Sequence, residues 1–280
     1  MGPGRPSPPR RLEPGDFAAI RDALWELTGI DLDDYHTQQM ERRLSAWLAR
    51  CGVETGQAFA RLLWEVPEEL DRFRQFLTIN VSSFYRDASR WAELEHRILP
   101  ELLRSSGRKG LRAWSVGCSV GAEPFTLAML LLERAPDGVH RIRATDIDRG
   151  SLVRARRGGP YGERELLELP SHLAHRFLEP TGSGEAFVVK PQVRRLVHFM
   201  YGDVLRESMP SNCYDLILCR NVVIYFTPQV RAQVFGALAR ALRPGGVLFV
   251  GGTETISHYW ELGLEYLAPS LYQWKRAPSV

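Results

Sequence analysis

The segment from Leu111 to Leu132, LRAWSVGCSVGAEPFTLAMLLL, constrains the fold of this chain more than any other feature. Its first residues have the pattern of a short strand, a glycine-bearing turn follows at 117–121, and an apolar helical pattern begins near Pro124. A second piece with the pattern of a strand, RATDID at 143–148, ends in acids. A strand, a glycine turn, a helix and a second strand ending in an acid predict an open parallel sheet of the Rossmann-like type.

Ligands of such sheets bind at the carboxyl ends of the strands, where a glycine turn permits close approach and an acid meets a ribose. The dinucleotide fingerprint requires Gly-x-Gly-x-x-Gly, but here the turn has glycine only at Gly117 and Gly121. Glu123 at the start of the helix would repel a pyrophosphate and suits a ligand with ammonium or sulfonium charge. These residues favour S-adenosylmethionine (SAM) over NAD. A doubly wound sheet without this cofactor is the alternative at this point.

The composition is that of an ordinary globular protein, with 44% hydrophobic and 25% charged residues among 280. The net charge of +3 gives no general attraction to nucleic acid. The longest strongly apolar run, 125–132, is too short for membrane insertion. The four cysteines show neither a pairing pattern nor metal-ligand spacing, so we expect reduced thiols, no metal and a cytoplasmic protein.

The chain divides by pattern into five segments. Residues 1–15, rich in Pro, Gly and Arg, are expected to be a disordered leader. Residues 16–86 predict a small helical domain in which Asp16 is a candidate helix cap, and residues 87–110 a helical linker. Residues 111–280 alternate strands with helices, which predicts an α/β SAM-binding domain. A β-subdomain is expected to be inserted in it at 178–200, next to a glycine-bearing turn.

The same patterns predict individual elements. Helices are expected in the N-terminal domain at 16–28, 36–50, 57–65 and 67–77. The strands of the main sheet are expected at 111–116, 141–145, 197–200, 214–219 and 246–251, with a closing hairpin at 266–275.

Three further motifs place polar groups where a core alone would not need them: TINVSSFYRD at 78–87, CRNVVIYF at 219–226 and LRPGGVLFVGGTET at 242–255. Taken singly, each is compatible with a cap, a turn or core aromatics. Together with the glycine turn followed by Glu-Pro and with ATDID, they resemble the chemotaxis receptor methyltransferases of the CheR family. The resemblance covers about 17–275 and has the family's order: a helical domain, then a class I, Rossmann-like SAM domain that contains a small inserted β-subdomain.

The resemblance implies a set of site residues. Arg86 would orient the incoming carboxylate and Tyr225 would lie beside the transferred methyl group, as catalytic residues. Asp146 would take the ribose hydroxyls, and Asp203 and Val204 would flank the adenine, although the family usually has Asn-Leu there. The full set implied for the cofactor is Asn80, Ser82, Arg86, Gly117, Glu123, Asp146, Asp203, Val204, Arg220 and Asn221.

The activity implied by the resemblance is the conversion of receptor glutamates to glutamyl methyl esters. A glutamate with a pKa of about 4.3 is already an anionic nucleophile at neutral pH, so no general base is needed. Alignment and exclusion of water are then the main catalytic tasks. This explains why the sequence carries no catalytic triad or metal cluster.

The expected partner is the helical bundle of a chemotaxis-type receptor. Arg42, Arg43 and Arg50 are candidates for docking its acidic helices, with an ordinary solvated basic face as the alternative. A receptor tail peptide could add to the β-subdomain as a strand. We expect a monomer that binds no nucleic acid. A SAM methyltransferase for RNA or a small molecule, and a SAM-binding regulatory protein without turnover, are the rival interpretations.

Overall fold

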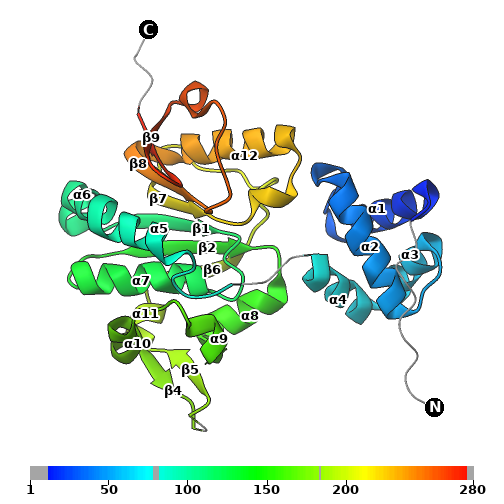
Figure 1. Ribbon diagram of the computed structural model, residues 1–280, viewed down its shortest axis with the longest axis horizontal. Coiled ribbons are helices and arrows are strands. Elements are labelled where there is room, and N and C mark those ends of the chain that lie inside the picture. Colours follow the sequence, from blue (N-terminus) through cyan, green and yellow to red (C-terminus); the bar gives the residue numbers. More distant parts are fainter. Residues whose placement is uncertain (1–11, 78–81, 183, 276–280) are drawn as a thin grey trace. The chain divides into compact units, whose positions relative to one another are not determined.

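The computed structural model describes residues 12–77, 82–182 and 184–275 (Figure 1). By its internal contacts the chain forms two compact units. The helical unit comprises the residues up to Ile79 together with Tyr225–Val230, and the sheet unit comprises the remainder. The boundary therefore falls before residue 80 rather than at the expected residue 86, because Phe84 and Tyr85 are buried in the core of the sheet unit.

The helical unit is built on amphipathic helices whose apolar side chains meet in one core. Ile20, Leu24, Leu44, Phe59 and Phe73 are fully buried there. The four predicted helices are confirmed with small shifts at their ends: α1 (Pro14–Thr28), α2 (Thr37–Cys51), α3 (Gly56–Glu65) and α4 (Pro67–Leu77). A short helix that was not predicted, η1 (Leu32–Asp34), lies between α1 and α2.

The prediction that Asp16 caps α1 is wrong, because this residue lies inside the first turn of the helix. Its carboxylate accepts a hydrogen bond from the Gly56 amide at 2.6 Å. A Cβ at residue 56 would lie 2.3 Å from the Asp16 carbonyl oxygen, so the close approach of α1 and α3 requires glycine there. The acid therefore joins two helices instead of starting one.

The sheet unit contains a seven-stranded sheet in the order β6-β2-β1-β7-β8-β10-β9. The first five strands in this order, β6, β2, β1, β7 and β8, are mutually parallel. The closing hairpin of β9 and β10 is antiparallel, both within itself and to β8. This arrangement confirms the predicted Rossmann-like domain with its helical N-terminal partner. The strands are β1 (Arg112–Val116), β2 (Arg141–Asp146), β6 (Val197–Tyr201), β7 (Tyr214–Cys219), β8 (Leu242–Val250), β9 (Leu264–Ala268) and β10 (Leu271–Trp274).

Residues 87–110 are not a linker, contrary to the prediction. They form the helical run α5 (Ala88–Glu93), η2 (Leu94–Ile98) and α6 (Leu99–Ser106), followed by η3 (Gly107–Lys109). The run lies beside the main sheet in Figure 1. One of its faces is apolar and belongs to the core of the sheet unit, where Trp91, Leu94 and Leu99 are completely buried. An isolated linker would leave this apolar face in water.

The other helices of the sheet unit connect its strands. Helix α7 (Ala122–Arg134) has almost no exposed apolar residue, as expected for a helix between a sheet and a second layer. The remaining ones are α8 (Arg149–Arg157), α9 (Glu163–Leu166), α10 (Ser171–Phe177), α11 (Pro191–Arg194), η4 (Val223–Tyr225), α12 (Pro228–Ala241) and η5 (Tyr259–Leu262).

The inserted sheet has three short antiparallel strands in the order β3-β5-β4, seen at the lower end of the sheet unit in Figure 1. They are β3 (Tyr161–Gly162), β4 (Leu178–Pro180) and β5 (Ala186–Val189). The expected range 178–200 is wrong at both ends. The first strand comes earlier in the chain, and residues 197–200 belong to β6, which pairs with β2 in the main sheet.

All four cysteines are free thiols. Within the described ranges, every helix is too short or too polar to cross a bilayer.

Candidate active site

The glycine turn after β1 lies against the loop that follows β7. Gly117 has a left-handed φ of +65°, and a Cβ at this residue would lie 2.4 Å from Cγ2 of Val222. The next amide, of Cys118, donates to the carbonyl of Thr145 at the end of β2. Only glycine satisfies both the backbone angle and the close contact, so the turn after β1 can pack directly against the loop after β7 at the carboxyl ends of these strands.

Asp146 ends β2, as predicted, and only 6% of it is exposed. Its carboxylate accepts hydrogen bonds from the amides of Ser119 at 2.7 Å and Asp148 at 2.8 Å. Burial raises the pKa of this carboxyl group to about 6 although these bonds and a third from the Ile147 amide stabilise the anion. A carboxylate has about four lone-pair sites, so these bonds leave it capacity to accept a further hydrogen bond.

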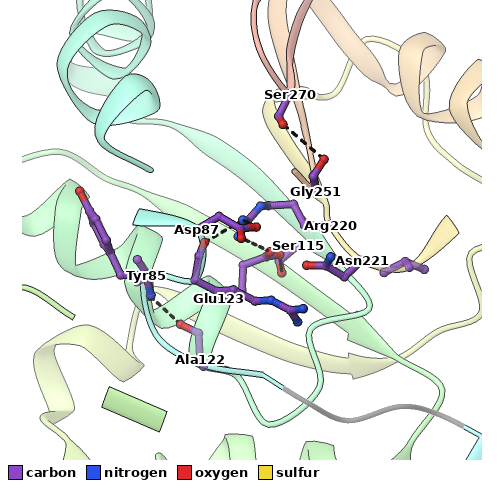
Figure 2. A network of polar contacts seen from close by, with 12 residues as sticks. Tyr85, Asp87, Ser115, Ala122, Glu123, Arg220, Asn221, Gly251 and Ser270 are labelled. Carbon is purple, nitrogen blue, oxygen red and sulfur yellow. Dashed lines mark hydrogen bonds and ion pairs between the residues drawn. The ribbon is translucent and has the colours of Figure 1, made fainter. Parts of the chain in front are cut away.

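Glu123 lies in the first turn of α7 and converges with two other elements of the site (Figure 2). The Ser115 hydroxyl donates to its Oε1 at 2.7 Å, and Nη1 of Arg220 lies 3.6 Å from its Oε2. Burial nevertheless raises the pKa of Glu123, because Arg220 and Ser115 offset only part of the desolvation. An additional positive charge beside Glu123 would therefore stabilise its carboxylate further.

Arg220 is the central cation of the site, and 3% of its side chain is exposed. Nη2 donates to the Arg86 carbonyl and to Oδ2 of Asp87, both at 2.7 Å (Figure 2). The guanidinium carbon lies 5.5 Å from the ring centre of Trp91 and 4.6 Å from that of Phe249. These aromatic faces and the two carboxylates hold Arg220 in one position.

Glu254 follows β8 and fastens the loop that carries Arg220. Its Oε2 accepts from the amides of Gly251 at 2.6 Å and Asn221 at 2.8 Å. Its Oε1 accepts from the amides of Val222 at 3.0 Å and Val223 at 3.1 Å. One buried carboxylate thus satisfies four main-chain donors at the carboxyl ends of β7 and β8. Asn221 itself has a left-handed φ of +58°, which this anchoring supports.

The remaining residues implied for the cofactor are placed as follows. Arg86 is half-buried and acts electrostatically on Glu123, whose pKa it lowers. Ser82 and Val204 are half-buried, and Asn80 lies outside the described residues. Asp203 accepts from the Leu205 amide at 2.9 Å and forms an ion pair with Arg206 at 3.3 Å, so it also shapes the turn after β6.

Tyr225 clusters with the helical unit, where its carbonyl accepts a hydrogen bond from the His36 amide. In the same unit, Arg42 and Arg50 are exposed on α2, with Arg50 stacked 5.3 Å from the Trp47 ring centre. Arg43 is half-buried. Its guanidinium donates to the Phe76 carbonyl and lies 4.7 Å from the centre of that ring. This contact removes Arg43 from the free basic surface that we predicted, whereas no such contact is found for Arg42 within the described part of the chain.

Comparison with known proteins matches both units. Residues 80–263 match the SAM-binding domain of CheR methyltransferases, and residues 15–78 match their all-alpha domain. The chain belongs to the CheR methyltransferase family. The chemotaxis protein methyltransferase of Listeria monocytogenes is 38% identical over 245 residues, which cover 87% of this chain and 91% of that protein. Chemotaxis protein methyltransferase 2 of Pseudomonas aeruginosa is 33% identical and covers 87% of both chains.

Sequence reasoning missed three side chains that organise this CheR site. Asp87 closes the motif at 78–87, and Ser115 precedes the glycine turn, but neither was assigned a role. Glu254 lies in the segment after the last strand. The signal for it was an acid four residues after a buried apolar strand, where a charge near the core requires a partner.

Proposed function

We propose that this protein transfers a methyl group from SAM to glutamate side chains of a chemotaxis-type receptor, which become glutamyl methyl esters. The observation that carries the proposal is the pair of largely buried carboxylates, Glu123 and Asp146, at the carboxyl edge of a sheet in a chain that has both CheR domains.

The site residues fit SAM by charge and by shape. Glu123 keeps a raised pKa beside Arg220, so an ammonium group nearby would restore the balance of charge. Asp146 offers acceptor capacity at the place where such sheets bind a ribose. Gly117 allows the turn after β1 to pack against Val222, next to Arg220 and Asn221 in the loop after β7. When bound, SAM supplies an electrophilic methyl group on a positively charged sulfur.

The residues of this chain then have binding and positioning roles. In the proposal, Glu123 binds the amino group, Asp146 binds the ribose hydroxyls, and Asp203 and Val204 flank the adenine. Arg86 orients the acceptor carboxylate, and Tyr225 packs beside the methyl group. Arg220 and Asn221 complete the pocket, with Asn80 and Ser82. Since the glutamate acceptor is ionised at neutral pH, no side chain has to remove a proton.

The exposed cations of α2 provide a docking surface for the acidic receptor helices. Substituting Arg42 and Arg50 together with alanine is expected to raise the KM for a receptor fragment about three- to tenfold at low salt and to leave kcat unchanged, because exposed charges steer encounter rather than chemistry. Initial methylation rates at varied receptor concentration measure this. Arg61→Ala, an exposed arginine on α3, is the matched control. A fall in kcat with constant KM would contradict the docking role.

The inserted sheet is the proposed site for a receptor tail. Its edge strand β4 is short and exposed at Glu179 and Pro180, so an extended peptide could pair beside it. We also propose that the protein acts as a cytoplasmic monomer.

The raised pKa of Asp146 predicts a pH dependence of SAM binding. Only the carboxylate accepts from both ribose hydroxyls, so SAM affinity should rise as pH increases through about 6, and be about tenfold weaker at pH 5 than at pH 8.

The stability of the free protein should change in the opposite sense. A carboxyl group with a folded pKa above its unfolded value binds more protons when folded, so its contribution falls between pH 4 and 6. Calorimetric titrations across this range measure the affinity. Asp146→Asn should bind weakly with a flatter profile, and an unchanged profile would exclude Asp146 as the titrating group.

Base-labile methyl transfer tests the proposed function. The protein is incubated with methyl-labelled SAM and a receptor fragment, alkali is added, and volatile methanol is counted. We expect methanol that disappears with Arg86→Ala and with a fragment in which the glutamates are replaced by glutamine. Label that remains on the acceptor after alkali would indicate another acceptor, such as RNA or a small molecule. SAM binding without transfer to any of these would indicate a regulatory SAM-binding protein.

A further inference from the structure

Strand β6 forms one edge of the main sheet and pairs only with β2 within the described part of the chain. In a parallel ladder, alternate residues turn their N–H and C=O groups toward the partner strand. The register with β2 therefore directs the main-chain groups of Val197, Phe199 and Tyr201 outward. Met200 and Tyr201 are 47% and 38% exposed, so this edge is open to a large partner.

A hollow of about 450 Å³ lies along this edge, and we call it the β6 hollow. Residues of β6 line it together with one arginine from α8 and one from the end of α11. The lining residues are Arg156, Arg194, Val197, His198, Phe199 and Met200.

The charge around the β6 hollow has one sign. Residues 149–157 and 191–201 contain six arginines and neither Asp nor Glu. Arg154 is neutralised by an ion pair with Glu165. Among the described residues, the other five have no carboxylate within ion-pair distance: Arg149, Arg156, Arg157, Arg194 and Arg195. In a chain with a net charge of only +3, this is a strong local concentration of positive charge.

We propose that the β6 hollow binds an acidic, extended segment of another protein, which adds to β6 as a strand and places carboxylates on Arg156 and Arg194. The outward main-chain groups match a peptide backbone, and a nucleic acid has no equivalent row of amides. The chain's own residues 1–11 cannot complement the hollow electrostatically, because they are basic and contain no acid.

Arg156 shows how the edge is protected without a partner. Its Nη2 donates to the outward carbonyl of Phe199 at 3.2 Å. A charged side chain laid over an edge strand is a known protection against unwanted pairing. A carboxylate is a stronger acceptor for a guanidinium than this carbonyl, so an acidic segment could draw Arg156 away and release the edge. A neutral segment would not, which would make the site selective for acids.

The test is binding of labelled ten-residue peptides to the full chain, followed by fluorescence anisotropy at low salt. The probes are alternating Glu-Val and Lys-Val peptides and a ten-nucleotide single-stranded DNA. We expect the Glu-Val peptide to bind and to slow amide exchange at Val197, Phe199 and Tyr201. The double substitution Arg156→Ala and Arg194→Ala should weaken binding at least about tenfold. The matched pair Arg104→Ala and Arg141→Ala, exposed and outside the hollow, should change it less than about twofold.

A charge reversal keeps the proposal testable if the double variant folds poorly. Arg156→Glu should lose the Glu-Val peptide and gain affinity for the Lys-Val peptide, with SAM affinity as the check of the fold. The proposal is overturned if both arginine pairs weaken binding equally or if exchange at β6 is unaffected. It is also overturned if the DNA binds more tightly than the Glu-Val peptide and if the substitutions of Arg156 and Arg194 abolish the binding of the DNA. The inference does not depend on methyl transfer, so its failure would leave the proposed function untouched.

Discussion

Replacing Arg220 with alanine is expected to lower the free energy of unfolding of the sheet unit by about 3–5 kcal/mol at pH 7. The guanidinium lies between Asp87 and Glu123, and 3% of it is exposed, so its removal leaves the largely buried Glu123 carboxylate without its ion-pair partner and with only the weaker influence of Arg86. The nearby Glu254 carboxylate raises the pKa of Glu123 further, which increases the cost. Urea unfolding followed by amide exchange in β1 and β7 measures the loss for this unit specifically.

A double-mutant cycle distinguishes this electrostatic cause from lost packing. If the cost is an uncompensated charge, Glu123→Gln should rescue much of the stability of Arg220→Ala, with a coupling energy above about 1 kcal/mol. If the cost is only the lost contact with Trp91 and Phe249, the two substitutions will be additive. Additivity would contradict the charge balance that we infer for the site.

Glu254→Gln is expected to cost about 2–6 kcal/mol and to weaken SAM binding at least about tenfold. Glutamine has the same shape, but its amide nitrogen would face two of the four main-chain donors that Glu254 now satisfies. Two buried N–H groups would then lack an acceptor. The loop from Arg220 to Val223 would loosen, and the guanidinium that it carries would lose its fixed position.

Amide exchange measures this effect directly. Exchange at Asn221, Val222 and Val223 should accelerate in Glu254→Gln while exchange in β2 stays slow. Glu261→Gln, an exposed acid in η5, is the control and should change neither exchange nor SAM affinity. If the loop amides keep their protection, Glu254 is not the residue that positions this loop.

The pattern of the sequence predicted the elements of the fold well because each rests on local spacing. Apolar residues at helical or strand spacing gave the four N-terminal helices and all five parallel strands. The carboxyl ends of parallel strands meet at one edge, so Glu123 and Asp146 could be brought together from their positions alone.

Contacts between distant residues escaped the same reasoning. Arg220 and Asp87 are 133 residues apart, and Glu254 binds amides about 30 residues away, so no local pattern reports either contact. The helical run at 87–110 has the same apolar periodicity whether it packs on a sheet or connects two domains. Its place in the core is evident only once the neighbouring sheet is known. The sequence does not distinguish Arg43 from Arg42, because an arginine stacked on an aromatic ring and a solvated arginine can occupy the same kind of helix position.

The most direct measurement is a calorimetric titration of the protein with SAM and with 5′-methylthioadenosine, which lacks the ammonium-bearing part of SAM. We predict that SAM binds about ten- to hundredfold more tightly than methylthioadenosine, and that Glu123→Gln removes most of this difference because it removes the carboxylate that binds the ammonium. Absence of SAM binding, or an undiminished preference for SAM in Glu123→Gln, would contradict the assignment of this site.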